Sequence, residues 1–77
     1  MAVTFSVYSR RGCHLCELLL EEFEPMLRGQ GRIEVLDVDE RPEWQQQFGD
    51  RVPVVCVGNR EICEYRLDRQ AVLREFG

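Results

Sequence analysis

The chain has 77 residues, of which 44% are hydrophobic and 31% are charged, and its formal net charge is -4. This length and balance predict a single globular domain over residues 1–77, since a disordered chain carries fewer apolar residues and a chain this short does not bury two cores. The acidic net charge argues against a general nucleic-acid binder and against a polybasic membrane surface, so we expect neither partner.

The first half of the sequence predicts a strand, a helix and a second strand. Residues 3–8 alternate apolar and polar side chains, as a half-buried strand does. From Cys13 onward, apolar residues recur at helical spacing, and we expect Pro25 to kink or end this helix, with residues 28–31 closing it. Residues 32–38 carry apolar side chains on both faces, which predicts a strand buried on both sides. The intervening helix indicates that the two strands are parallel.

The next part of the chain predicts a short helix and a β-hairpin. We expect Asp39 to cap the short helix and Pro42 to occupy its first turn. Residues 52–57 are nearly all apolar and are followed by the turn dipeptide Gly58-Asn59. A second β-prone run over residues 61–65 completes the predicted hairpin.

A final helix is expected after the hairpin. Asp68 is placed to cap it, and Val72, Leu73 and Phe76 are expected to face inward. The resulting order, β-α-β-α-β-β-α, predicts an α/β domain with a four-stranded mixed sheet flanked by helices.

The beginning of the chain does not have the pattern of a secretory signal, because its basic residues follow the apolar run instead of preceding it. No stretch reaches the ~18 apolar residues of a membrane helix. We therefore expect a cytoplasmic protein in a reducing compartment, where the four cysteines would not form structural disulfides. A secreted miniprotein with two disulfides is the alternative that the same cysteine count suggests.

Two of the cysteines, Cys13 and Cys16, lie where the polar loop enters the first helix. In the first turn of a helix, unpaired N–H groups and the helix dipole favour a thiolate, and Arg10, Arg11 and His14 add positive charge nearby. The expected pKa of Cys13 is therefore below the ~8.5 of a free cysteine. Cys16 lies on the apolar stripe and would be the buried thiol that resolves a mixed disulfide. Simple core packing of both side chains is the alternative.

A proline begins the apolar strand in the stretch RVPVV, where Val52 precedes Pro53. Proline at such a position is normally an edge residue or a strand-entry residue. Because only ~5% of X-Pro bonds in folded proteins are cis, the sequence by itself favours a trans peptide bond here.

The stretch YSRRGCHLC, followed by a βαβ pattern, RVPVV, a hairpin and a final helix, resembles the glutaredoxin-like members of the thioredoxin superfamily. The likeness extends over essentially the whole chain, and it is strongest to small bacterial glutaredoxin-like proteins with a C-H-L-C motif. The resemblance implies a thioredoxin-like fold, with Cys13 as nucleophile and Cys16 as resolving thiol. It also implies that Pro53 is a cis-proline beside the site and that Val52 offers backbone hydrogen bonds to a disulfide substrate.

The same resemblance marks further candidate substrate-binding residues. Arg10 stands where many glutaredoxins carry a basic residue, and His14-Leu15 replaces their Pro-Tyr between the cysteines. Asp68 matches the aspartate of their Gly-Gly-x-x-Asp stretch, whose backbone holds glutathione. Here Glu64 and Tyr65 replace the two glycines, which disfavours glutathione because a side chain blocks close backbone approach.

The predicted function is thus a thiol–disulfide oxidoreductase that needs no cofactor, acts as a monomer and takes a disulfide-containing protein or a small thiol as substrate. A zinc site of four thiols is one alternative, although six residues separate Cys56 from Cys63. An iron–sulfur cluster shared by two chains through Cys13 and a non-catalytic binding module on the same fold are others. Cys56 is expected in the core, and the sequence leaves the place of Cys63 open.

Overall fold

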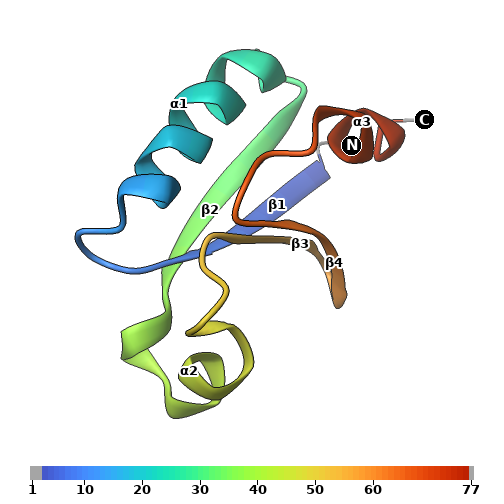
Figure 1. Ribbon diagram of the computed structural model, residues 1–77. Helices are drawn as coiled ribbons and strands as arrows, with labels where there is room; N and C mark the ends of the chain where they lie inside the picture. The colour runs from blue at the N-terminus through green and yellow to red at the C-terminus, as the bar shows by residue number, and fades with distance from the viewer. Residues whose placement is uncertain (1–2, 77) are drawn as a thin grey trace.

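The computed structural model describes residues 3–76 and has the predicted order of elements, so the α/β class is confirmed. The strands and helices, in chain order, are β1 (Val3–Ser9), α1 (His14–Leu27), β2 (Gly31–Asp37), α2 (Pro42–Phe48), β3 (Val54–Val57), β4 (Arg60–Glu64) and α3 (Arg69–Arg74). In Figure 1, α1 and α3 lie on one side of the sheet and α2 lies on the other. None of the helices among these residues is long and apolar enough to cross a membrane.

The four strands form one mixed sheet in the order β2-β1-β3-β4. β1 pairs with β2 in parallel and with β3 antiparallel, and β3 and β4 form a hairpin, so the predicted parallel pair and the predicted hairpin are both confirmed. In the central antiparallel pair, Tyr8 lies opposite Val54 and Ser6 lies opposite Cys56. This register places the end of β1 beside the start of β3.

The larger core lies between the sheet and the pair α1 and α3. Its buried side chains come from β1, α1, β3 and α3, and they are Phe5, Val7, Leu19, Phe23, Leu27, Val55 and Val72. The rings of Phe5 and Phe23 meet edge to face, with 5.1 Å between their centroids. Such aromatic contacts add to the free energy of burial, which is the main term that stabilises a domain of this size.

A second, smaller core lies on the opposite face of the sheet, under α2. Val38, Phe48, Val54 and Cys56 are buried there. The ring of Tyr8 stacks on Phe48, with 4.0 Å between centroids. The short helix therefore covers only the part of the sheet near the end of β1.

The sequence led us to expect that Pro25 kinks or ends the first helix. α1 does not end there but continues to Leu27, with Pro25 inside it. Phe23 and Leu27 flank the proline and are both buried, so packing holds the last turn although one backbone hydrogen bond is lost there. Arg28 then takes a left-handed conformation, with a φ of 43°, and closes the helix where the RGQG stretch was expected to do so.

β2 is an edge strand and none of its residues is fully buried, so the predicted burial on both of its faces is wrong. The side chain of Val35 is 52% exposed, because β1 and not β2 occupies the centre of the sheet under α1. Val38 is buried, but it lies beyond the strand, in a 3₁₀ turn over Val38–Glu40.

The predicted cap of α2 is also wrong, because this 3₁₀ turn intervenes between β2 and the helix. The N-cap residue of α2 is Arg41, which makes no side-chain capping bond, and Pro42 takes the first helical position as expected. The carboxylate of Asp37 instead accepts a hydrogen bond from the backbone N–H of Asp39, over 2.9 Å.

The cap of α3 is confirmed, since the carboxylate of Asp68 accepts a hydrogen bond from the N–H of Ala71, over 3.1 Å. Val72 is fully buried and Phe76 packs on the larger core. The prediction that Leu73 faces inward is wrong: its side chain is 58% exposed. Val72 is on the face of α3 that meets the larger core, and the next residue, Leu73, is about 100° further round the helix and points to solvent.

Replacing the two neighbours Val72 and Leu73 by alanine tests this burial. Val72→Ala is expected to lower the free energy of unfolding by ~2 kcal/mol, because it removes buried methyl groups from the larger core. Leu73→Ala, the matched control, is expected to change it by less than ~0.5 kcal/mol. Urea unfolding measures both values, and equal losses would contradict the assigned orientation of α3.

Candidate active site

The cysteine pair occupies the N-terminus of α1. Cys13 is the N-cap residue, immediately before the helix and not within its first turn, and its φ of -82° and ψ of 105° are extended. Its Sγ accepts a hydrogen bond from the N–H of Cys16, over 3.2 Å. The two sulfurs are joined as a disulfide, with the Cα atoms 5.2 Å apart. The Cys13 sulfur therefore lies among the unpaired N–H groups that favour negative charge.

The two sulfurs differ in access to solvent. Cys13 is partly exposed at the loop edge, whereas the residue exposure of Cys16 is 2%. A backbone hydrogen bond from the N–H of Cys13 to the carbonyl of Arg10 holds the loop, over 3.2 Å. Gly12 lies inside this turn with a φ of 74°, a conformation that glycine adopts without strain. The loop thus presents one sulfur and hides the other.

The sheet brings Val52 and Pro53 to the same end of the molecule as this loop. Because Tyr8 pairs with Val54 in the antiparallel register, the residue before Val54 lies beside Ser9, from which the loop to Cys13 departs. Pro53 is buried and Val52 is half-buried. The peptide bond between them is cis.

Two of the three basic residues near the cysteines, Arg10 and His14, face carboxylates. The Nε of Arg10 lies 3.3 Å from a carboxylate oxygen of Asp39. The Nδ1 of His14 lies 3.8 Å from a carboxylate oxygen of Glu17, and the His14 side chain is 79% exposed. The Arg10 charge is therefore shared with an acidic partner, and the His14 side chain is surrounded by water. The helix N-terminus is thus the steadier source of positive potential at Cys13.

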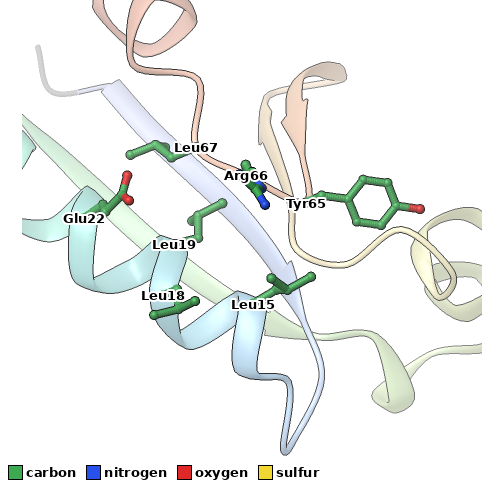
Figure 2. Close-up of a pocket in the computed structure, with 7 residues that line it drawn as sticks. All are labelled: Leu15, Leu18, Leu19, Glu22, Tyr65, Arg66 and Leu67. Carbon is green, nitrogen blue, oxygen red and sulfur yellow. The ribbon is translucent and has the colours of Figure 1, made fainter.

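A groove of about 350 Å³ lies along the first turns of α1, between this helix and the segment that follows β4. It is lined by Leu15, Leu18, Leu19, Glu22, Tyr65, Arg66 and Leu67, which Figure 2 shows. Leu15 lies between the two cysteines and is 42% exposed. The groove therefore reaches the first turn of α1, and its leucines form an apolar wall.

Tyr65 connects this region to the segment before β3, a role that the sequence did not reveal. Its N–H donates to the carbonyl of Pro53 over 2.8 Å, and its hydroxyl donates to the carbonyl of Asp50 over 3.1 Å. Its φ of 65° is left-handed. The signal in the sequence was the resemblance to glutaredoxins, which matches Tyr65 to a glycine of their Gly-Gly-x-x-Asp stretch, and glycine adopts that conformation freely.

Arg51 is a second residue that sequence reasoning missed. Its guanidinium donates to Glu61 over 2.7 Å and to Glu64 over 3.0 Å, both on β4. It also donates to the backbone carbonyl of Gln47 over 2.7 Å. These bonds join the segment before β3 to the hairpin and to α2. The carboxylate of Asp68, by contrast, is engaged in capping α3.

The four cysteines do not converge. Cys56 is buried in the core under α2, as expected, whereas Cys63 is half-buried and packs against the larger core on the other face of the sheet. Burial raises the pKa of both thiols above their ordinary values. Among residues 3–76, no group of three His, Cys, Asp or Glu side chains is arranged to hold a metal ion. The geometry therefore does not favour a zinc site of four thiols.

The fold and the paired cysteines at a helix N-terminus define a thioredoxin-like domain. The sequence profile of the glutaredoxin-like domain family (DUF836) matches residues 4–77, so the chain belongs to this glutaredoxin-like family. A comparison with curated proteins gives no match.

Solved structures share this fold. The solution NMR structure of Ne2328 from Nitrosomonas europaea aligns with a TM-score of 0.86 and 29% identity, over 97% of this chain and 92% of that one. A protein from X. campestris aligns with a TM-score of 0.72 and 25% identity, over 95% and 97% of the two chains. Thioredoxin 1 from Thermosipho africanus aligns with a TM-score of 0.63 and 20% identity, over 95% and 93%, and shows likeness of fold alone.

The unequal access of the two sulfurs is tested by alkylation of the reduced protein. Cys13 is expected to react with iodoacetamide well before Cys16, and its rate is expected to reach its plateau at a lower pH than that of a free cysteine, because the helix N-terminus favours the thiolate. Mass spectrometry after proteolysis locates the label, and the same protein in denaturant, where both thiols react, is the control. Ordinary cysteine titration at Cys13 would contradict the electrostatic argument.

The contacts of Arg51 predict a pH dependence of stability. Its hydrogen bond lowers the pKa of the Glu61 carboxyl below the ordinary value. A carboxylate whose folded pKa is lowered stabilises the fold above its unfolded pKa of ~4.3, and this contribution is lost as the pH falls through the folded pKa. In Arg51→Ala, the loss of stability between pH ~6 and pH ~3 is therefore expected to be smaller than in the wild type.

Urea midpoints at the two pH values measure this difference. Arg66→Ala, which removes an arginine outside this cluster of contacts, is the matched control and is expected to keep the pH dependence of the wild type. If Arg51→Ala and the wild type lost the same stability on acidification, the ion pairs of Arg51 would have no role in it.

Proposed function

We propose that the protein is a thiol–disulfide oxidoreductase in which Cys13 is the nucleophile and Cys16 the resolving thiol. The observation that carries the proposal is the partly exposed Cys13 sulfur at the N-cap of α1, paired with a buried Cys16 sulfur one turn further in. A thiolate at such a position is stabilised by backbone N–H groups, and the thiolate is the form that attacks disulfides.

The reaction proceeds by two exchanges. The Cys13 thiolate attacks one sulfur of a substrate disulfide, and the other substrate sulfur leaves as a thiolate and takes up a proton. Cys16 then loses its proton and attacks the Cys13 sulfur, which releases the second substrate thiol. The substrate disulfide is thereby reduced to two thiols, and the two protein thiols are oxidised to the Cys13–Cys16 disulfide. An external dithiol reductant returns the protein to its starting state.

The surrounding residues supply binding. Val52 is proposed to hydrogen-bond the substrate through its backbone, with Pro53 packed behind it. Leu15 offers apolar contact at the mouth of the groove. Arg10 and His14 are proposed to contribute positive charge at the rim, and their ion pairs with carboxylates limit that contribution.

The proposed substrate is a disulfide-containing protein or a small thiol, exchanged by a monomer in the cytoplasm without a cofactor. Glutathione is not required in this scheme. Asp68 remains a candidate contact for a substrate at the start of α3, where the carboxylate already bonds the N–H of Ala71. The tyrosine at position 65 stands where a glycine would allow the backbone of a bound peptide to approach closely.

Serine variants of the two cysteines test the assignment of roles. Cys13→Ser is expected to abolish disulfide reduction, because no nucleophile remains. Cys16→Ser is expected to accumulate mixed disulfides through Cys13, because the second exchange is blocked. Cys56→Ser, which alters a buried thiol on the opposite face of the sheet, is the matched control and is expected to retain turnover.

Non-reducing electrophoresis and mass spectrometry of the Cys16→Ser protein detect the trapped species and name the attached substrate. Turnover in Cys13→Ser, or mixed disulfides that form through Cys63 instead of Cys13, would overturn the proposal.

A further inference from the structure

We propose that Tyr65 is a positioning residue for the reaction: it holds residues 50–53 so that the backbone of Val52 is ordered before a substrate arrives. This inference rests on the proposed function, since it concerns the segment that would bind the disulfide. Tyr65 itself is not proposed to touch the reacting sulfurs.

The two hydrogen bonds of Tyr65 bracket this segment. The backbone N–H of Tyr65 donates to Pro53 at one end, over 2.8 Å, and the hydroxyl donates to Asp50 at the other, over 3.1 Å. Figure 2 shows the ring of Tyr65 directed away from the leucines of the groove. The hydroxyl end of the side chain therefore contacts the segment that precedes β3, although Tyr65 is also one of the residues that line the groove.

Arg51 anchors the same segment from within. It bonds both Glu61 and Glu64 on β4, and Tyr65 follows β4 directly. The end of the hairpin thus holds residues 50–53 through a backbone bond, a hydroxyl bond and a pair of charge-assisted bonds. Charge-assisted hydrogen bonds are the stronger kind, and together with the tyrosine they fix both ends and the middle of the segment.

The backbone of Tyr65 indicates that its side chain is needed. A φ of 65° costs free energy for a tyrosine and almost none for a glycine. A glycine would make the same backbone bond to Pro53 without that cost. Tyrosine adds the ring and the hydroxyl that bonds the carbonyl of Asp50. This added bond offsets the cost of the left-handed backbone at position 65.

An ordered segment matters for binding and not for the reactivity of Cys13. If the Val52 backbone is already fixed, a substrate does not have to order it, and binding loses less entropy. The thiolate of Cys13, in contrast, depends on the N-terminus of α1, which Tyr65 does not contact through any of these bonds. Loosening the segment should therefore weaken substrate binding while the attacking sulfur stays as reactive as before.

Tyr65→Phe isolates the hydroxyl and keeps the ring. We expect the substrate concentration at half-saturation to rise about fivefold, the effect of one lost hydrogen bond, with the limiting rate unchanged within about twofold. The measurement is single-turnover reduction of the symmetrical disulfide of a short cysteine peptide by the reduced protein. Alkylation of Cys13 by iodoacetamide is expected to match the wild type. Hydrogen exchange of the Arg51 N–H, which lies within this segment and bonds the carbonyl of Phe48, is expected to become faster by NMR.

Tyr8→Phe is the matched control, because the ring of Tyr8 packs on Phe48 and Trp44 in the smaller core, and its hydroxyl makes no hydrogen bond to residues 50–53. It should leave half-saturation and the exchange of the Arg51 N–H unchanged. A Tyr65→Phe protein that behaves like Tyr8→Phe, or that loses limiting rate and alkylation together, would overturn the positioning role. A wild-type protein that reduces no disulfide would instead overturn the proposed function, and exchange of the Arg51 N–H would still decide whether Tyr65 orders the segment.

Discussion

The antiparallel pairing of β1 with β3 is the constraint on which the site depends. Because the two strands run in opposite directions, the end of β1, which leads to Cys13, lies beside the start of β3, which follows Pro53. Burial of Val7 and Val55 on one face and of Val54 on the other holds this register. A slip by one residue would exchange the two faces and expose these side chains, so the same burial that stabilises the sheet keeps the cysteine loop next to its neighbouring segment.

The order of the elements was predictable because each element has a local signal: alternation in strands, helical spacing after Cys13, a turn dipeptide in the hairpin and a cap at Asp68. The sequence did not predict which faces of these elements are buried. Val35 and Leu73 are apolar, yet their exposure depends on which strand is central and on how a six-residue helix is rotated against the sheet. Such facts are set by the packing of distant elements, which the local pattern does not contain.

The features of the site also fall into those that the sequence predicted and those that only the structure shows. The cysteine pair is recognisable from residue types and spacing, whereas the role of the proline segment was implied only by the resemblance to glutaredoxins. The contacts of Tyr65 and Arg51 join parts of the chain that are far apart, and nothing in the local pattern of either residue indicates its partners. The number of cysteines alone suggested a possible zinc site of four thiols. The structure places Cys56 and Cys63 on opposite faces of the sheet, which the composition does not reveal.

The left-handed backbone at position 65 also limits how this part of the protein can vary. Valine, isoleucine and threonine are nearly excluded there, because a branched Cβ clashes with the backbone at positive φ. Glycine, asparagine and aspartate enter most readily, and none of them carries a phenol that reaches the carbonyl of Asp50. A substitution at position 65 can therefore remove the cost of the left-handed backbone only by giving up the hydrogen bond to Asp50.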